Sequence, residues 1–236
     1  MIFLNPEFNS IIAEQFEFVK SLTARRDKTV NVIRHRATGT RLVYLNVNAD
    51  PSVYAFLADI SHPNLPRVYS VNYESGRCEA FEEFIDGITV GEVLETGLYR
   101  ESGVRAVVTG VCSALGTLHG ANIIHRDIKP ENVIVDSSGV VKLIDFDAAR
   151  IYKGYKPADT IFTGTAGFAA PEQFSISESD ARTDIFALGV MMNVMLTGEH
   201  PSKKLYGGRY GRIIEKCICV DPNGRFRNVN ELVSSL

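Results

Sequence analysis

The sequence contains no tryptophan, few cysteines and no long apolar run. A membrane-spanning helix needs about 20 apolar residues, and the longest apolar stretch, Ile185–Leu196, is interrupted by Asn193. Of the four cysteines only Cys217 and Cys219 lie close together, and no second pair of Cys or His is nearby, so no zinc site is expected. Free thiols of this kind are typical of the reducing cytosol, and we predict a cytoplasmic protein without membrane contact.

The chain also lacks a marked excess of charge of either sign. Its 25 basic and 28 acidic residues leave a net charge of −3, which excludes nucleic acid or an anionic membrane as an expected partner. A hydrophobic content of 45% with 22% charged residues indicates a folded globular chain. The apolar residues at the N-terminus have no basic flank, so no signal peptide is expected. Nothing in the sequence specifies an oligomeric state.

Before residue 86, the sequence consists mainly of short segments typical of β-strands. They are rich in valine, tyrosine and phenylalanine, and turn-forming pairs such as Thr38-Gly39 separate them. One short helix is expected among them, with Asp50 as its N-cap and Pro51 as its first residue. The predicted strands are Thr29–Arg36, Arg41–Val47, Pro66–Asn72 and Arg77–Phe84.

After residue 86, helical patterns dominate. Apolar residues recur every three or four positions from Val104 to Leu118, which predicts a helix that ends near Gly120. The segment Thr183–Thr197 is apolar on nearly all sides and is expected to be a buried helix. We therefore predict an α+β fold in one domain, residues 1–236, with a small, mostly β N-lobe (16–86) and a helical C-lobe (87–236), and a ligand between them. Two further helices are predicted at Ile213–Cys219 and Val229–Leu236.

A polar segment followed by a hairpin carries the chemistry. Residues 125–132 read HRDIKPEN, and residues 133–144 form two short apolar strands around a turn at 136–139. Asn132 and Asp145 flank this hairpin at nearly equal distance from its turn, so their side-chain oxygens are expected close together. Two hard oxygen ligands suit Mg²⁺, which shares its remaining positions with phosphates and water. Just before them, the Asp127 carboxylate could accept a hydroxyl proton, and the Lys129 ammonium could neutralise phosphate charge.

These residues resemble the family of eukaryotic-type Ser/Thr protein kinases, including those of bacteria. The family's catalytic loop reads H-R-D-x-x-x-x-N, and a D-F-G triplet opens with its metal-binding Asp; here Asp145-Phe146-Asp147 stands at that triplet. The resemblance covers roughly residues 16–236 and implies a bilobal protein-kinase-like fold. Three further segments resemble the family: GTAGFAAPE at 164–172, DIFALG at 184–189 and DPNGRF at 221–226.

The resemblance implies roles for the polar residues of the catalytic half. Asp127 would orient or deprotonate the substrate hydroxyl, and Lys129 would contact the γ-phosphate of ATP. Asn132 and Asp145 would hold Mg²⁺. Thr165 would line the substrate site beside Asp127, and its presence together with Lys129 favours Ser or Thr over Tyr as the acceptor.

Other positions would bind the nucleotide or support the site. The adenine would bond to the backbone at Glu83 and Ile85, with Val30, Val43 and Leu143 as apolar walls. The implied cofactors are ATP and Mg²⁺. Structural roles are implied for five more residues: His125 and Phe146 would pack in the core, Asp184 would hold the backbone of the catalytic loop, and Glu172 and Arg225 would form a buried ion pair.

The N-terminal third departs from the family pattern. The stretch 22–30, which matches the glycine-rich loop, has no glycine, so a looser cover over the phosphates is expected. Leu45 stands at the strand lysine and Val53 at its glutamate partner, so neither position leaves an unpaired buried charge. Lys28 aligns with the lysine of the with-no-lysine kinases and is our candidate for the phosphate contact. Alternatively, it is a solvated loop lysine beside Arg25 and Arg26.

Regulation is expected in the activation segment, residues 145–172. Thr160 and Thr163 are candidates for autophosphorylation, with Arg126 as the receiver of the phosphate, or they are unmodified surface threonines. Asp147 replaces the glycine of D-F-G, a variation also found in small-molecule kinases. The stretch between Pro201 and Ile213 is short, so the helix that often docks substrates in this family is expected to be truncated.

We therefore predict a compact, bacterial-type Ser/Thr protein kinase, weakly active, whose partners are proteins with Ser or Thr acceptors. Two alternatives remain open. The missing Lys–Glu pair and the glycine-free loop favour a pseudokinase that binds nucleotide or acts as a scaffold. The D-F-D triplet gives weaker support to a small-molecule phosphotransferase.

Overall fold

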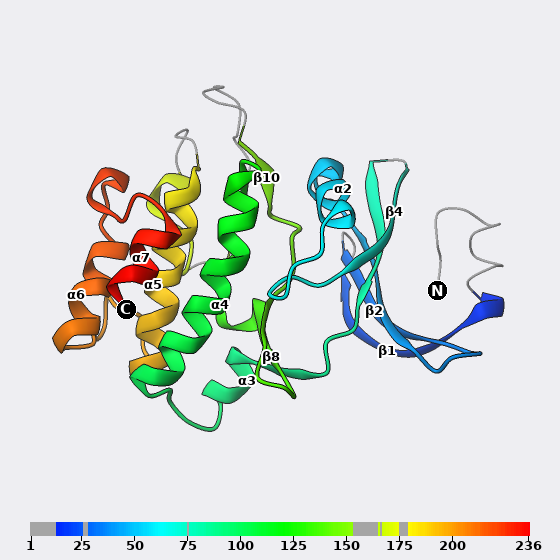
Figure 1. Ribbon diagram of the computed structural model, residues 1–236, viewed down its shortest axis with the longest axis horizontal. Coiled ribbons are helices and arrows are strands. Elements are labelled where there is room, and N and C mark those ends of the chain that lie inside the picture. Colours follow the sequence, from blue (N-terminus) through cyan, green and yellow to red (C-terminus); the bar gives the residue numbers. More distant parts are fainter. Residues whose placement is uncertain (1–12, 26–27, 75, 153–164, 166, 175–178) are drawn as a thin grey trace. The chain divides into compact units, whose positions relative to one another are not determined.

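Alternating apolar and polar residues in the first third of the chain form strands, and these assemble into one antiparallel sheet. The computed structural model describes residues 13–25, 28–74, 76–152, 165, 167–174 and 179–236. The chain divides into two compact units, the first made of the residues up to His62 with Pro66–Ile85, the second of Pro63–Leu65 with Asp86–Leu236. The sheet lies in the first unit, in the order β1-β2-β3-β5-β4 (Figure 1). Its strands are β1 (Phe16–Arg25), β2 (Lys28–His35), β3 (Arg41–Val47), β4 (Val68–Glu74) and β5 (Arg77–Glu83).

The helix α2 (Pro51–Asp59) begins where the sequence predicted. The Asp50 side chain accepts a hydrogen bond from the Ser52 N–H at 3.0 Å, and Pro51 occupies the first turn, where its missing N–H costs nothing. Val53, Tyr54 and Leu57 are buried on one face of the helix. The predicted cap and first residue are therefore confirmed, and the four predicted strands correspond to β2–β5 within two residues at each end.

The expected glycine-free loop is largely strand. The sequence matched residues 22–30 to the family's glycine-rich loop, predicted a strand only from Thr29 onward and did not predict β1. Instead β1 and β2 pair without interruption from Thr23 opposite Val30 to Arg25 opposite Lys28, so only two residues separate the strands. Strand pairing fixes the backbone here, and the looser cover over the phosphates stays a prediction.

A buried polar cluster connects β3 and β5 on one side of this sheet. Glu79 is 1% exposed, and its Oε1 accepts hydrogen bonds from Tyr44 Oη at 2.8 Å and Asn46 Nδ2 at 2.9 Å. Arg77 donates to the Asn46 carbonyl at 2.8 Å. Burial, followed by the contact with Glu79, raises the pKa of Tyr44, so its hydroxyl stays protonated and donates. No sequence pattern indicated this cluster.

The second unit is built around two long helices. α4 (Glu101–Gly120) and α5 (Ala181–Thr197) lie side by side, and α5 is buried on nearly all sides, as predicted (Figure 1). Gly189 in α5 allows a close approach, since a Cβ there would lie 2.4 Å from Cys217 Cβ of α6. The other elements are β6 (Gly87–Thr89), α3 (Val90–Leu94), β7 (Ile123–Ile124), η1 (Pro130–Asn132), β8 (Val133–Asp136), β9 (Val141–Leu143), β10 (Arg150–Ile151), η2 (Pro171–Phe174), α6 (Gly208–Cys217), η3 (Pro222–Gly224) and α7 (Val229–Ser235).

Two helices of this unit differ from the prediction. α6 spans Gly208–Cys217 rather than the predicted Ile213–Cys219, and its early residues include Gly208 and Gly211, which are weak helix formers. α3 was not predicted, although Thr89 and Glu92 form a capping box in which the side chain of each accepts from the backbone N–H of the other. α7 confirms the predicted C-terminal helix.

Three further predictions concern the state of the cysteines, the presence of membrane-spanning helices and the fold class. All four cysteines are free thiols, as predicted, and three of them are buried. Within the part of the chain that the structure describes, no helix has the length and apolar character of a membrane span. A sheet in the first unit and helices in the second confirm the α+β fold class; the lobe limits at 16–86 and 87–236 stay predictions.

Candidate active site

The hairpin of β8 and β9 brings the backbone at Asn132 close to the backbone at Asp145, the two predicted metal ligands. Val133 pairs with Leu143 and Val135 with Val141. One step beyond the last pair, the Ile144 N–H donates to the Asn132 carbonyl at 2.9 Å, and Asp145 follows directly. The predicted hairpin is therefore confirmed, and it brings the chain on both sides of its turn to one place.

The side chains of the catalytic loop converge on the Asp127 carboxylate. Lys129 Nζ donates to Asp127 Oδ2 at 2.6 Å, and Asn132 Nδ2 donates to the same oxygen at 3.0 Å. The other oxygen, Oδ1, accepts from Thr165 Oγ1 at 2.7 Å. Lys129 Nζ also donates to Thr165 Oγ1 at 2.8 Å, which closes a ring of three side chains. The structure thus places all four predicted catalytic residues in contact.

This ring keeps Asp127 ionised. Burial alone would raise the pKa of its carboxyl, but the hydrogen bonds from Lys129 and Thr165 and the charge of Lys129 outweigh burial. The pKa of Asp127 therefore lies below its usual value. A carboxylate of low pKa is a weak base, which suits a group that holds and orients a hydroxyl more than one that removes its proton early.

Asn132 and Asp145 fit a hard divalent cation. Asn132 is 4% exposed, and its Nδ2 donates to the backbone carbonyl of Asp127 at 2.8 Å as well as to its side chain. The amide oxygen is therefore the remaining polar atom of Asn132. Among the described residues there is no group of three or more His, Cys, Asp or Glu side chains, so a cation here would share its shell with phosphates, as Mg²⁺ does.

The backbone around Asp127 is held by a buried carboxylate from α5. Asp184 is fully buried, and it accepts from the backbone N–H groups of His125 at 3.0 Å and Arg126 at 2.8 Å. His119 Nε2 of α4 lies 2.8 Å from the same side chain. Arg126 has φ 68° and Asp145 φ 70°, strained values for residues other than glycine. The structural role expected of Asp184 is confirmed, and His119 is a partner that the sequence did not indicate.

His125 and Phe146 are both fully buried and pack edge to face with ring centroids 5.3 Å apart. His125 Nδ1 accepts from the Asp127 N–H at 3.3 Å, and its Nε2 lies 3.2 Å from the Ile144 carbonyl. This pair of contacts requires the neutral ring with its proton on Nε2. Burial lowers the pKa of His125, outweighing the nearby carboxylates. Both residues are packing residues, as expected.

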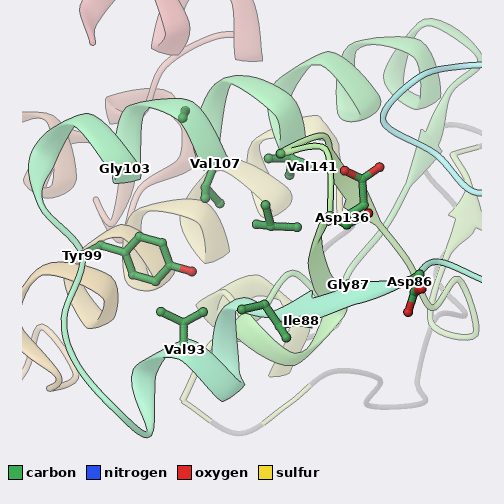
Figure 2. A pocket seen from close by; sticks show the side chains of 13 residues that line it. Asp86, Gly87, Ile88, Val93, Tyr99, Gly103, Val107, Asp136 and Val141 are labelled. Carbon is green, nitrogen blue, oxygen red and sulfur yellow. The ribbon is translucent and has the colours of Figure 1, made fainter.

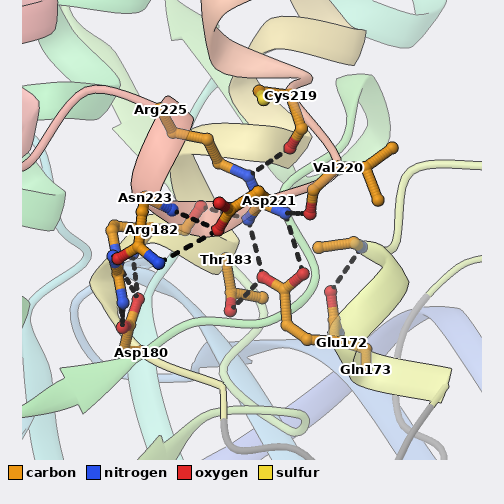
Figure 3. Close-up of polar contacts among 11 residues, drawn as sticks. Glu172, Gln173, Asp180, Arg182, Thr183, Cys219, Val220, Asp221, Asn223 and Arg225 are labelled. Atoms are coloured by element: carbon orange, nitrogen blue, oxygen red, sulfur yellow. Dashed lines mark hydrogen bonds and ion pairs between the residues drawn. The ribbon is translucent and has the colours of Figure 1, made fainter.

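The end of the activation segment is anchored by a buried ion pair (Figure 3). Arg225 Nη1 and Nη2 donate to the two Glu172 carboxylate oxygens at 2.6 and 2.8 Å, and Thr183 Oγ1 donates to Glu172 at 3.0 Å. The predicted pair is confirmed. Gln173, which the sequence did not single out, donates to the Arg126 carbonyl at 2.9 Å and so connects this segment to the catalytic loop.

The predicted nucleotide residues lie in both units. Lys28 stands opposite Val47, and Val30 stands opposite Leu45, in the pairing of β2 with β3. Residues directly opposite share a face of the sheet, so Lys28 and Leu45 lie on the same face two positions apart. Leu45 is 5% exposed and Val53 fully buried, so the two residues predicted to stand at the family's ion pair belong to the apolar core.

The backbone groups predicted to bind adenine lie at the end of the first unit. Val43 pairs with Glu82, next to Glu83, whose N–H donates to the Arg67 carbonyl at 2.8 Å. No hydrogen bond among the described residues uses the Ile85 N–H. Leu143, the predicted wall in the second unit, is fully buried. Thr160 and Thr163 lie outside the described residues.

Comparison with known proteins gives consistent matches. Residues 52–217 match the protein kinase domain, so the matched region begins after β3 and excludes the divergent hairpin. The chain is 30% identical to the probable serine/threonine-protein kinase PknB of Lactococcus lactis over 83% of its length and 33% of that protein. For PknB of Mycobacterium tuberculosis the identity is 31%, over 71% of this chain and 29% of that protein.

A eukaryotic relative shows a similar level of identity. The Aurora kinase of Saccharomyces cerevisiae is 29% identical over 83% of this chain and 56% of the yeast protein. The chain spans about a third of the length of the PknB kinases that it matches. Because the family match covers well over half of the residues, this chain belongs to the protein kinase domain family.

Proposed function

We propose that this protein transfers the γ-phosphoryl group of ATP to serine or threonine hydroxyls of proteins. The observation that carries the proposal is the ring formed by Asp127, Lys129 and Thr165, with Asn132 bound to the same carboxylate. A pseudokinase has no need to keep an ionised carboxylate, an ammonium and an amide in mutual contact. The bacterial relatives are named as serine/threonine kinases, which agrees with a hydroxyl of this kind as the acceptor.

In this mechanism Asp127 orients the attacking hydroxyl by accepting its hydrogen bond. The hydroxyl oxygen forms a bond to the γ-phosphorus while the bond from that phosphorus to the bridging oxygen breaks and ADP leaves. Since the pKa of Asp127 is low, the proton reaches its carboxylate late, once the hydroxyl oxygen has lost electron density to phosphorus. Lys129 stabilises the negative charge on the transferring group.

The cofactor would be ATP with a divalent cation. Asn132 and Asp145 would hold Mg²⁺, which neutralises phosphate charge when it is bound. Lys28 would supply the phosphate contact that Leu45 cannot make, because both side chains lie on one face of the sheet. The Ile85 N–H and the Glu83 backbone would bind the adenine, beside Val30 and Val43, with Leu143 as a further apolar wall. The free thiols agree with a reducing, cytoplasmic setting.

The test compares the protein with its Asp127→Asn variant in phosphoryl transfer from labelled ATP to a generic basic protein. Asparagine keeps the shape and the contact with Thr165 but removes the charge. We expect transfer to fall about a hundred- to ten-thousand-fold, with ATP affinity changed little. Asp59→Asn, an exposed acid outside this ring, serves as the matched control and should retain activity.

Three other outcomes would contradict the proposal. Nucleotide binding without transfer in the unmodified protein would make it a pseudokinase. Transfer only to small molecules would make it a small-molecule phosphotransferase. Equal transfer by the protein and Asp127→Asn would show that the ring is not the catalytic centre. Mass spectrometry of the protein after incubation with Mg-ATP would in addition show whether Thr160 or Thr163 becomes phosphorylated.

A further inference from the structure

A single buried asparagine fixes the loop that follows α5. Asn193, which interrupts the apolar sequence of this helix, is fully buried. Its Nδ2 donates to the carbonyls of Glu199 and Lys204, each at 2.8 Å, and its Oδ1 accepts from the Tyr206 N–H at 2.9 Å. A buried amide whose donors and acceptor are all used favours one conformation of the groups around it, because any other conformation leaves polar atoms unpaired. The α5–α6 loop, residues 199–206, is therefore held at both ends by one side chain.

His200 connects the α5–α6 loop to the segment that carries Thr165. Its Nδ1 accepts from the backbone N–H of Ser202 at 3.2 Å. The proton of the neutral ring therefore lies on Nε2, which donates to the Gly167 carbonyl at 2.9 Å. The His200 carbonyl accepts from the Lys203 N–H at 2.9 Å, which holds the backbone at the same point. Both the ring and the backbone of His200 are thus fixed, so the fold sets the direction of the donor toward Gly167.

The Gly167 segment leads directly to the ring around Asp127. The Thr165 carbonyl accepts from the N–H groups of Phe168 at 3.0 Å and Ala169 at 3.1 Å, which closes a turn around Gly167. Gly167 has φ 95°, a conformation that only glycine adopts without strain, and glycine also leaves the backbone the most freedom to move. A hydrogen bond to the Gly167 carbonyl restricts that freedom. Since the Thr165 hydroxyl donates to Asp127 at 2.7 Å, the position of this turn sets the position of a member of the ring.

A different contact holds the other end of this segment. Gln173 Oε1 accepts from the Ala170 N–H at 2.9 Å, and its Nε2 donates to the Arg126 carbonyl at 2.9 Å. The segment thus has one anchor on the catalytic loop and one on the α5–α6 loop. The α5–α6 loop has no part in the apolar hollow of Figure 2, which is lined by β6, α3, α4, the β8–β9 hairpin and residues next to them. A substitution of His200 therefore tests the contact with Gly167 and leaves the lining of that hollow unchanged.

We propose that His200 is a positioning residue for the acceptor side of the reaction. By donating to the Gly167 carbonyl it holds the turn of residues 165–169, and through Thr165 it keeps the acceptor hydroxyl aligned with Asp127. The contacts of His200 lie outside the ring, so it acts through another residue rather than on the reacting atoms. This role rests on the proposed function. It assigns part of the acceptor site to the short α5–α6 loop, which consists of turns and extended chain and contains no helix in its described residues, 199–206.

The test measures phosphoryl transfer from labelled ATP to a generic basic protein by variants of His200. His200→Leu keeps much of the size but removes the donor, and it should lower kcat/KM for the acceptor about three- to tenfold, the effect of one hydrogen bond. The KM for ATP should stay unchanged. His200→Gln offers an amide N–H at a similar reach and should restore most of the loss. Lys203→Gln, at an exposed position of the same loop, is the matched control and should stay within about twofold of the unmodified protein.

A second measurement does not depend on catalysis. Hydrogen exchange of residues 168–174 is followed by mass spectrometry without ATP or acceptor. In His200→Leu this exchange should become about three- to tenfold faster, because the turn opens more often when one hydrogen bond is lost. His200→Gln and Lys203→Gln should exchange at nearly the unmodified rate. Exchange of β3 in the first unit should be the same in all four proteins, since the change is local.

Four results would overturn the role of His200. The first two are equal transfer by His200→Leu and the unmodified protein, and equal exchange of residues 168–174 in both. The others are a KM for ATP that rises as much as the KM for the acceptor, and a His200→Gln variant no better than His200→Leu, since either indicates a general structural role. An absence of transfer in the unmodified protein would overturn the proposed function instead, and the exchange measurement would still show whether His200 holds the turn.

Discussion

The two units of this chain differ in whether they contain the polar residues typical of the family. In the second unit, the motif residues Asp127, Lys129 and Thr165 contact one another directly. In the first unit, Leu45 and Val53, the residues that the sequence comparison predicted at the family's ion pair, are buried apolar side chains. The region that matches the protein kinase domain begins at residue 52, so it leaves out β1, β2 and β3 with Leu45 but includes the rest of the first unit.

The difference indicates that the two members of a buried ion pair can be replaced jointly in a kinase domain, whereas the replacement of one alone is costly. Replacing one member of a buried ion pair leaves an unpaired charge in the core, a costly state, whereas replacing both by apolar residues is often neutral or stabilising. Leu45 and Val53 show the second route. In the proposed mechanism the ring around Asp127 has no such route, because each of its members would serve the reacting groups as well as its neighbours. Four substitutions test this division, from the largest expected effect to the smallest.

The ion pair that anchors the second unit should dominate its stability. Arg225→Ala leaves the Glu172 carboxylate buried without its partner and should lower the free energy of unfolding by about 3–5 kcal/mol. The control is Arg182→Ala, whose side chain is 30% exposed and pairs with Asp180, with an expected loss of about 1 kcal/mol or less. Urea unfolding measures both, and equal losses would contradict the special role of Arg225.

The variant Lys28→Ala tests whether the first unit contributes to ATP binding or phosphoryl transfer. A charge-assisted contact with phosphate is worth about 1.5–3 kcal/mol, so we expect ATP affinity or phosphoryl transfer to fall about ten- to a hundredfold. Lys20→Ala, an exposed lysine of β1, is the matched control. Unchanged kinetics in Lys28→Ala, with a loss in Arg41→Ala, would transfer the role to Arg41.

The neutral His125 should make the second unit sensitive to moderate acid. Because burial holds the pKa of His125 below its ordinary value, the unfolded chain binds a proton below about pH 6.5 that the folded chain does not. The free energy of unfolding should therefore decrease as the pH falls from about 6.5, by at most about 1.4 kcal/mol per pH unit, until the folded His125 is itself protonated. His125→Gln removes this contribution, and an equal slope in both proteins would show that His125 is not its source.

The smallest effect concerns the cap of α2. Asp50→Ala removes the acceptor for the Ser52 N–H and should lower the free energy of unfolding by about 1 kcal/mol. Asp50→Asn keeps an acceptor oxygen and should lose much less. If both variants unfold like the unmodified protein, the cap does not contribute to stability in the first unit.

Sequence reasoning located the features that depend on residues close together in the chain. The hairpin after Asn132 follows from a turn between two apolar runs, and the cap at Asp50 follows from a local pattern. The carboxylate of Asp184 was placed correctly only because the family resemblance supplied its partner, 59 residues before it. Local signals thus located most of the longer elements, and the resemblance was needed for the contacts between distant residues.

The sequence did not predict the strand β1 or the buried cluster around Glu79, and each failure has a physical reason. The strand β1 carries lysine, glutamate and serine among exposed apolar residues, so it shows no clean alternation. Glu79 is a charged residue at a fully buried position, and its partners Tyr44 and Asn46 lie 35 and 33 residues away on another strand. Only the pairing of β3 with β5 brings them together, and no single segment carries that information.

The paired hairpin at β1 and β2 has a thermodynamic consequence. A flexible glycine-rich segment loses conformational entropy when it closes on a ligand, and that loss opposes binding. Here, the backbone of Arg25 pairs with that of Lys28 within the sheet, so much of the ordering takes place during folding. Calorimetry of nucleotide binding should therefore show a smaller entropic penalty than a glycine-loop kinase shows.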